Sequence, residues 1–493
     1  MKNVLLVNPK CNATFWSFKH ALRFASGKAA CPPLGLLTMA GMLPENWNIR
    51  LLDMNLKKLR DRDLENADLV MVGAMMIQRI SATEVLEKCR NMGRKVVAGG
   101  PLFTSNPQDF TGLADYLVLN EAEITLPPFL EDFKQGVPKP VYTSDQFADL
   151  AETPLPRWDL IRPQDYQTLM VQYSRGCPFN CEFCDITNLF GRVPRVKSSE
   201  QLLSELEAVY SLGWRGQLFF VDDNFIGNKR EVRKVLKDLV VWTEERGHPF
   251  NLLTEASVNL ADDDELIELM VRSGFDSVFV GLETPNEESL RECGKKQNCH
   301  RDLMGAIKKI QRSGMQVLGG YIVGFDNDDE SIFSRQIKFI QESGVVTAMV
   351  GLLNAAPNTR LWNRLKSENR LLPGATGDNT DGTINFIPRM EKDVLVKGYR
   401  QIMRTIYSPR FFYQRVSKFL EEYKPRYRRK FNARELKGFL KSLFFLGVLG
   451  NGASQWYYWK MMVKAALFYR NSFAEAMTLM VYGYHFRRVA RQV

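Results

Sequence analysis

Three cysteines crowded into eight residues constrain this chain more than any other feature of its sequence. Cys177, Cys181 and Cys184 lie in the run CPFNCEFC, a C-x3-C-x2-C spacing that directly follows an apolar stretch at 169–174. Thiolates are the usual protein ligands of iron–sulfur clusters, and three of them leave one iron of a four-iron cubane open to chelate a small molecule. A structural zinc site is the alternative, but it takes four protein ligands, and the neighbouring sequence offers no fourth Cys or His. The spacing therefore favours a cluster.

The other five cysteines do not suggest disulfides. Eight cysteines are too few and too scattered in 493 residues to form a disulfide framework. Cys293 and Cys299 lie beside His300 and allow a second metal site, although cysteines in such a polar segment are more often unmetallated. The first residues lack the pattern of a secretory signal, and no apolar run is long enough to span a membrane. We therefore expect a reducing, cytoplasmic location.

Short apolar runs alternate with helical stretches in two successive series, which predicts an α/β fold. The first series indicates a doubly wound, Rossmann-like domain over residues 1–140, with apolar runs at 4–7, 69–72, 96–98 and 116–119. A proline-marked linker is expected at 141–164. The second series indicates a partial (β/α)6 barrel over 165–390, with its chemistry at the carboxyl ends of the strands. Its six expected strands are 169–174, 217–221, 251–256, 277–282, 316–323 and 347–353.

The last part of the chain, 391–493, is expected to be helical and is strongly basic. It holds 21 Lys+Arg against 6 Asp+Glu, whereas the first 390 residues hold 45 against 50. A basic run at 424–430 precedes apolar and aromatic segments at 443–449 and 456–462. Two interpretations stay open: helices that pack over the barrel mouth with their charges in water, or an interfacial helix on an anionic membrane surface. Nucleic acid is not an expected partner, because no recognised nucleic-acid-binding fold is apparent.

The cysteine spacing, with Phe183 just before the last cysteine, resembles the radical S-adenosylmethionine superfamily. The resemblance continues at the ends of later strands, in FFVDDNF at 219–225, GLET at 281–284, GGYIVGF at 319–325 and NAAPNT at 354–359. It implies that the three cysteines bind a [4Fe–4S] cluster whose open iron holds S-adenosylmethionine. Acidic residues at strand ends are also common helix caps, and Glu255 and Ser257 fit packing or capping equally well. The implied S-adenosylmethionine contacts are Phe183, Asp222, Asp223, Glu255, Ser257, Glu283 and Asn354.

The amino-terminal domain carries no G-x-G-x-x-G turn, and it resembles the cobalamin-binding domain of many radical enzymes. A long loop separates Asn8 from Pro33, and the pair Gly99-Gly100 follows a strand, where glycines let a bulky ligand approach the backbone. No D-x-H-x-x-G supplies a lower axial histidine, and His20 fits a surface or packing role. Our hypothesis is that Met76 or Gln78 covers the lower face of cobalt, with ordinary core packing as the alternative. The implied cobalamin contacts are Asn8, Pro33, Gly35, Met76, Gln78, Gly99, Gly100 and Glu121.

Nearly the whole chain resembles the cobalamin-dependent radical S-adenosylmethionine methyltransferases, and particularly the hopanoid C-2 methylases. Similar stretches are PPLGLL at 32–37, CEFCDI at 181–186 and FVDDNFIGN at 220–228. The resemblance implies methylation of an unactivated carbon with a [4Fe–4S] cluster, S-adenosylmethionine and methylcobalamin. Because the cofactors carry this chemistry, no catalytic side chain is expected beyond the residues that hold them.

The substrate is open at this level. A hopanoid-like lipid is expected, and the alternatives are a protein side-chain carbon such as that of glutamine, or a radical reaction without methylation, such as cyclisation or ring rearrangement. A cobalamin sensor without enzymatic activity is a further alternative, and the intact cysteine triplet argues against it. The expected partners are a lipid or protein substrate and a reductant such as flavodoxin or ferredoxin. Peripheral contact with the inner face of the membrane is a further expectation.

Overall fold

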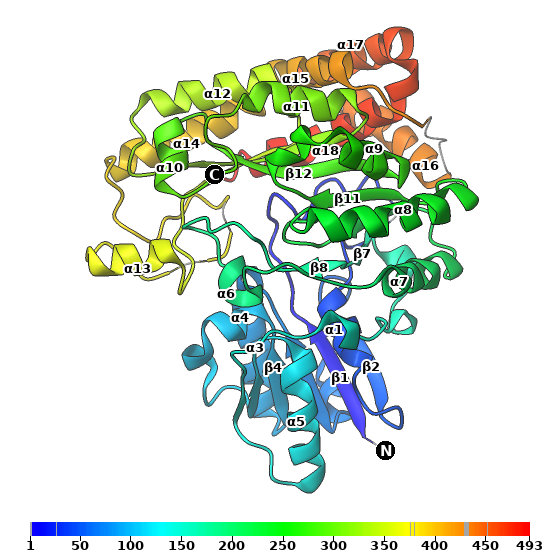
Figure 1. Ribbon diagram of the computed structural model, residues 1–493, viewed down its shortest axis with the longest axis vertical. Coiled ribbons are helices and arrows are strands. Elements are labelled where there is room, and N and C mark those ends of the chain that lie inside the picture. Colours follow the sequence, from blue (N-terminus) through cyan, green and yellow to red (C-terminus); the bar gives the residue numbers. More distant parts are fainter. Residues whose placement is uncertain (1, 26, 375, 379, 428–432, 451) are drawn as a thin grey trace.

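Two parallel sheets and a helical carboxyl-terminal part make up the chain (Figure 1). The computed structural model describes residues 2–25, 27–374, 376–378, 380–427, 433–450 and 452–493. The fold is therefore α/β with a helical end, as the sequence predicted. The last three residues of the basic run at 424–430 lie outside the described residues.

The first sheet is doubly wound and has the strand order β2-β1-β3-β4-β5-β6. Both faces are covered by helices, so β1 and β3 are almost entirely buried. The sequence did not predict β2, whose exposed Arg50 interrupts an apolar run, or β6, which is only two residues long. The strands are β1 (Asn3–Asn8), β2 (Asn48–Asp53), β3 (Leu69–Gly73), β4 (Val96–Gly99), β5 (Tyr116–Val118) and β6 (Val141–Tyr142). The helices are α1 (Leu34–Ala40), α2 (Asp61–Glu65), η1 (Met76–Gln78), α3 (Arg79–Asn91), α4 (Pro101–Ser105), η2 (Pro107–Phe110) and α5 (Ala122–Gln135).

The second sheet is a partial barrel of six parallel strands in the order β14-β13-β12-β11-β10-β7. All six predicted strands are present, and the structure adds a short antiparallel hairpin, β8–β9, beside the cysteine loop. The strands are β7 (Thr168–Val171), β8 (Ser174–Arg175), β9 (Arg195–Val196), β10 (Gln217–Phe220), β11 (Asn251–Glu255), β12 (Phe275–Glu283), β13 (Gln316–Val323) and β14 (Ala348–Leu352).

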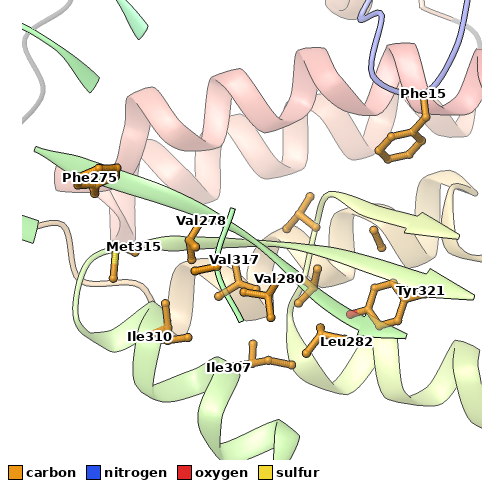
Figure 2. Packing of buried hydrophobic residues seen from close by; sticks show 14 of the residues in the cluster. Phe15, Phe275, Val278, Val280, Leu282, Ile307, Ile310, Met315, Val317 and Tyr321 are labelled. Carbon is orange, nitrogen blue, oxygen red and sulfur yellow. The ribbon is translucent and has the colours of Figure 1, made fainter. Parts of the chain in front are cut away.

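Helices cover the outer face of this sheet. Val278, Val280 and Leu282 of β12 point from that face toward Ile307 and Ile310 of α11 (Figure 2). The helices of this part are α6 (Ile186–Phe190), α7 (Ser199–Ser211), α8 (Lys229–Glu245), η6 (Val258–Asp262), α9 (Asp264–Arg272), α10 (Glu287–Glu292), α11 (Leu303–Arg312), α12 (Ser331–Ser343) and α13 (Arg360–Ser367). The linker between the two sheets contains η3 (Leu150–Glu152), η4 (Trp158–Leu160) and η5 (Pro163–Asp165).

Buried hydrogen bonds fasten the carboxyl-terminal helices to the barrel, and the Tyr407 hydroxyl, just after the first of these helices, donates to the Ala348 carbonyl oxygen of β14 at 2.6 Å. Arg415 is fully buried, and its guanidinium donates to the carbonyl oxygen of Ile406 and to Oε1 of Gln341, both at 2.6 Å. Within the described part of the chain no helix is long and apolar enough to cross a membrane. The helices are α14 (Lys392–Ile406), α15 (Pro409–Glu422), α16 (Ala433–Ser442), the π-helix η7 (Leu443–Val448), α17 (Ala453–Phe468), η8 (Arg470–Ser472) and α18 (Phe473–Val489).

The long loop after β1 reaches from the first sheet to these helices. The Phe15 ring stacks on Phe486 of α18 with centroids 4.3 Å apart, and the Phe15 carbonyl bonds His485 Nε2 at 2.8 Å. His20 packs beside His485, which agrees with the packing role expected for it. In Figure 1 the amino end of β1 lies farther from the barrel than its carboxyl end, so the carboxyl edge of the first sheet faces the barrel.

Candidate active site

The three predicted cluster ligands lie in the loop that follows β7 and β8. Cys181 is buried, and Cys177 and Cys184 are partly buried. Gly176 precedes the loop with φ +95°, and a Cβ there would lie 3.0 Å from three carbonyl oxygens, those of residues 190, 191 and 193. Only glycine fits this left-handed and crowded position. The β8–β9 hairpin and Gly176 therefore fix the shape of the cysteine loop.

The surroundings of the thiols suit an anionic cluster. Asn224 Nδ2 lies 3.9 Å from the Cys177 sulfur, and Gln297 Nε2 lies 3.8 Å from the Cys181 sulfur. Burial raises the pKa of Cys177 and of Cys184, and the nearby charge of Cys181 raises both further. The amide N–H donor near the Cys177 sulfur opposes this effect of burial, and the donors near Cys177 and Cys181 stabilise the negative charge that a cluster brings.

The thiols do not form the site of a single ion. Among the described residues, no three Cys, His, Asp or Glu side chains converge closely enough to bind one metal ion. The ligands of a cubane each bind a different iron atom, so they need not meet at one point. A cubane therefore does not need the convergence on one point that a single zinc ion would require.

A partly buried lysine, which sequence reasoning missed, lies near the cysteines. Lys295 Nζ donates to Glu283 Oε1 at 2.6 Å, and the two side chains are 13% and 6% exposed. Burial lowers the pKa of Lys295, but the charges of Glu283, Cys181 and Cys184 outweigh it and raise that pKa above its usual range. Glu283 has φ +62° at the end of β12, and a Cβ on Gly281 would lie 2.5 Å from its Oε1. The strand end is therefore shaped around this ion pair.

The two aspartates at the end of β10 bind the backbone near the cysteine loop. Asp222 accepts hydrogen bonds from the backbone N–H groups of Tyr173 and Ser174 at 3.1 and 2.5 Å, and burial raises its pKa to about 7. Asp223 accepts from the N–H of Gly176 at 2.8 Å, and burial raises its pKa to about 6. Both carboxylates thus connect β10 to the chain that leads into the cysteine loop.

Glu255 and Ser257 lie at the end of β11, near these carboxylates. Burial, with the charges of Asp223 and Asp222, raises the pKa of Glu255 to about 8. Ser257 bonds Asn224 through its backbone N–H at 3.1 Å and donates from its hydroxyl to Asn259 at 2.6 Å. A cavity of about 380 Å³ opens here, and its lining includes Pro178, Phe179, Asn224, Gly227, Ser257 and Asn259.

The remaining predicted S-adenosylmethionine contacts lie around the same end of the barrel. Asn354, after β14, donates to the carbonyl oxygens of Leu352 and Thr383 at 3.2 and 3.1 Å. The Phe183 ring is 6.3 Å from Phe325, between centroids.

Cys293 and Cys299, the pair that allowed a second metal site, make hydrogen bonds to the backbone. Their sulfurs donate to the carbonyl oxygens of Leu290 and Lys295, each at 3.5 Å.

At the end of β1, a buried network includes two of the predicted cobalamin contacts. Gln78 is 5% exposed, and its amide donates to Asn8 Oδ1 at 2.9 Å and to the Pro9 carbonyl at 2.6 Å. Its Oε1 accepts from the N–H of Met75 at 2.9 Å. Asn8 in turn donates to Asp53. The Gln78 side chain is therefore committed to holding the loop after β1.

The methionines and glycines at the carboxyl edge of the first sheet differ in their exposure and in the space around them. Met76 is partly buried, with its sulfur 3.1 Å from Asn106 Nδ2, whereas Met75 is 60% exposed. A Cβ on Gly99 would lie 2.7 Å from the Val118 carbonyl, and Gly100 has φ +95°, so the sheet itself requires both glycines. Pro33 caps α1, and a Cβ on Gly35 would point into open space.

Glu121, the last predicted cobalamin contact, is the centre of an ion network between the two sheets. Its carboxylate, 1% exposed, accepts from Arg175 Nη1 at 2.8 Å and from Arg195 Nη1 at 2.9 Å. Arg175 Nη2 also donates to Glu123 Oε1 at 2.8 Å, and although burial raises the pKa of Glu123, Arg175 brings it below its usual range. The network joins the loop after β5 to the hairpin beside the cysteines.

Comparison with known proteins places these features in a family. Residues 22–130 match the B12 binding domain, 171–340 match the radical SAM superfamily, and 359–493 match a domain of unknown function, DUF4070. An uncharacterized methyltransferase of Synechocystis sp. is 42% identical over 413 residues, which cover 83% of this chain and 77% of the relative. The hopanoid C-2 methylase of Rhodopseudomonas palustris is 33% identical with the same coverage. This chain belongs to the cobalamin-dependent radical S-adenosylmethionine methyltransferases.

A solved structure agrees with this fold. The radical S-adenosylmethionine methyltransferase TsrM of Kitasatospora setae, solved with cobalamin and a [4Fe–4S] cluster, is similar with a TM-score of 0.62 and 14% identity, over 93% of this chain and 98% of that one. The matched radical SAM and B12 binding domains mean that the enzyme uses a [4Fe–4S] cluster, S-adenosylmethionine and cobalamin, as the sequence predicted. Because the family consists of methyltransferases, the alternative of a radical reaction without methylation is not supported.

Arg175→Met tests the ion network between the sheets. Removing one partner of a buried ion pair leaves the other charge uncompensated, so we expect the free energy of unfolding to fall by about 3 kcal/mol. Loss of the link should also lower the yield of methylated product per 5′-deoxyadenosine formed. Arg157→Met is the matched control, because the Arg157–Asp159 pair is exposed and contributes at most about 1 kcal/mol. Equal unfolding midpoints for the two variants in urea would contradict this account.

Proposed function

We propose that this methyltransferase methylates an unactivated carbon of an apolar polycyclic substrate, with a hopanoid-like lipid as the expected class. The observation that carries the proposal is the inner face of the barrel, which is apolar beneath the cysteine loop. When bound, the cofactors supply the chemistry: one S-adenosylmethionine yields the radical that removes a hydrogen atom, and a second provides the methyl group through cobalamin. The protein has to bind, orient and shield the substrate between them.

The inner face follows from strand register. Val278, Val280 and Leu282 point outward, so Phe279 points inward by alternation. Phe279 is paired with Glu255 on one side and with Leu318 on the other. The same face carries further apolar side chains that are partly exposed, which are Met170, Phe219, Leu253, Ile322 and Met349. An apolar substrate gains about 25 cal/mol for each Å² of apolar surface it buries on such a wall.

Trp16 from the loop after β1 closes this face. Its ring meets Phe279 edge-on with centroids 5.4 Å apart, and its Nε1 donates to the Met349 sulfur at 2.8 Å. The indole is 37% exposed, so part of its surface is available to a ligand. Since the loop starts at the end of β1 in the first sheet, Trp16 joins that part of the chain to the inner face of the barrel.

We assign the cofactor contacts on the same geometry. Cys177, Cys181 and Cys184 are the proposed cluster ligands, and Lys295 with Glu283 balances charge beside them. Glu255, Ser257, Asn354 and Phe183 line the proposed S-adenosylmethionine site, while Asp222 and Asp223 act by positioning the cysteine loop. For cobalamin, the proposed contacts are Asn8, Pro33, Gly35, Gly99 and Gly100. Gln78 is bonded to the loop after β1, and the Met76 sulfur lies beside Asn106. Of the side chains in the loop after β3, that of the exposed Met75 would therefore be the one available to a bound cobalamin.

The partners of the reaction follow from its chemistry. Cleavage of S-adenosylmethionine at the cluster needs an electron, for which flavodoxin or ferredoxin is the expected class of donor. An oxygen-sensitive cluster and unpaired cysteines fit the cytoplasm. A lipid substrate adds contact with the inner face of a membrane. A protein side-chain carbon remains the second candidate, favoured by the positive charge of residues 391–493.

Substrate class is tested by deleting the gene and comparing the lipids and proteins of both strains by mass spectrometry. We expect a methylated polycyclic lipid to disappear from the mutant and to return with the wild-type gene. A gene encoding Cys184→Ala is the matched control and should not restore it. Loss of a methyl group from a protein with an unchanged lipid profile would contradict the lipid assignment.

Substituting the cysteines one at a time with alanine tests the cluster assignment. Each variant should lose most of the cluster iron, and 5′-deoxyadenosine formation should fall by more than about a hundredfold, since all three thiolates hold one cubane. Cys89→Ala, which removes a buried thiol in α3 of the other sheet, should retain full iron content after anaerobic reconstitution. A full iron content in any of the three variants contradicts the assignment.

Trp16→Ala tests the apolar wall. Removing a large aromatic surface from a binding site costs about 1.4 kcal/mol or more, so KM for the lipid should rise about tenfold or more. The iron and cobalamin contents should stay unchanged. Trp47→Ala, on the far side of the first sheet beside Phe133, is the control and should leave KM unaltered. An unchanged KM in Trp16→Ala would remove this residue from the substrate site.

A further inference from the structure

The helical end of the chain presents two apolar stripes to solvent. Leu436, Leu440, Phe444 and Val448 recur every four residues along α16 and η7, and each is between 51% and 60% exposed. On α17 the stripe consists of Trp456, Trp459, Val463 and Leu467, which are between 39% and 58% exposed. Residues at this spacing share one side of a helix, so each element shows a continuous apolar line.

The two stripes meet where α17 packs on η7. Trp459 Nε1 donates to the Gly447 carbonyl at 2.9 Å, and a Cβ on Gly447 would lie 2.8 Å from the Trp459 ring. Gln455 donates to the same carbonyl at 2.6 Å. Leu449 and Phe468, both exposed, extend the apolar area at the ends of the two elements. We call these ten residues the α16–α17 surface.

Exposed apolar side chains are concentrated on this surface. In the described part of the chain, 22 large apolar side chains are exposed, and ten of them belong to it. Single exposed apolar residues are ordinary, but contiguous groups on a protein in water mark a site of interaction. We therefore expect the α16–α17 surface to bind a partner.

Charge indicates what kind of partner fits. Residues 436–470 contain five Lys and Arg and no Asp or Glu. Lys437 and Lys460 are exposed, and the Lys460 ammonium lies 4.8 Å above the Trp456 ring. A second copy docked through the same surface would set these lysines against their own counterparts, which disfavours self-association. An anionic surface suits both the lysines and the tryptophans.

We infer that the α16–α17 surface docks the enzyme on an anionic lipid bilayer. No described helix can span the bilayer, so the stripes rest in its interface with their apolar side chains among the acyl chains. The inference does not require the proposed substrate, because binding to lipid is measured without turnover. It adds a place where a membrane-embedded substrate would meet the enzyme.

Co-sedimentation of the reconstituted holoenzyme with vesicles tests the inference. We expect binding to vesicles of phosphatidylcholine with phosphatidylglycerol, weak binding to phosphatidylcholine alone, and loss of binding at high salt. Leu440→Glu with Val463→Glu should weaken binding at least about tenfold, since two apolar side chains leave the interface. Lys437→Gln and Lys460→Gln should each weaken it about fivefold.

Val241→Glu on α8 is the matched control, because Val241 is as exposed, at 56%, but lies outside the surface. It should bind vesicles as the wild type does, and circular dichroism with cluster absorbance should show that every variant is folded. The inference is overturned if the wild type ignores anionic vesicles or if the double variant binds them equally well. It is also overturned if light scattering shows that the double variant turns a dimer into a monomer while vesicle binding persists.

Discussion

The buried ion network around Glu121 is the interaction on which the rest of the structure depends. Two cofactors on separate sheets can act on one substrate only if the sheets are fixed relative to each other. Arg175 and Arg195 belong to the strands that flank the cysteine loop, and Glu121 belongs to the loop that follows β5. Charges buried in this way hold a specific geometry, because any displacement leaves a charge without its partner in a poorly solvated place. The Tyr166 hydroxyl donates to Asp53 Oδ2 at 3.1 Å, a second contact that holds the two sheets together.

Charged side chains of both signs organise the cluster end of the barrel in the same way. Lys295 is paired with Glu283 and lies near the charges of Cys181 and Cys184. The positive φ of Glu283 and the absence of a side chain at Gly281 both make room for that pair. Asp222 and Asp223 anchor the approach to the loop through backbone N–H groups. The catalytic chemistry belongs to the cofactors, so the protein acts mainly by placing charges and by excluding water from an apolar barrel.

The sequence predicted the α/β class, the six barrel strands and the iron–sulfur cluster, because apolar runs and the cysteine spacing are local signals. S-adenosylmethionine and cobalamin were predicted from the resemblance to the family. It missed β2 and β6, which are an edge strand with a polar interruption and a two-residue strand. It also missed Lys295, Gln297 and the bonding of Gln78 to the β1 loop, since these contacts join residues far apart in the chain. Glu121 was expected at cobalamin, and only the fold reveals its pairing with Arg175. No sequence pattern marked Trp16, because its partners Phe279 and Met349 lie in the barrel, far along the chain.

The central claim is that the cluster at the barrel mouth and the cobalamin of the first sheet work together to methylate an unactivated carbon of an apolar substrate. The most direct measurement is turnover by the oxygen-free holoenzyme with S-adenosylmethionine labelled in its methyl group, a polycyclic lipid and a reductant. The account predicts labelled lipid together with 5′-deoxyadenosine and S-adenosylhomocysteine in equal amounts. Labelled lipid formed without 5′-deoxyadenosine, or 5′-deoxyadenosine formed without transfer of the label, would contradict it.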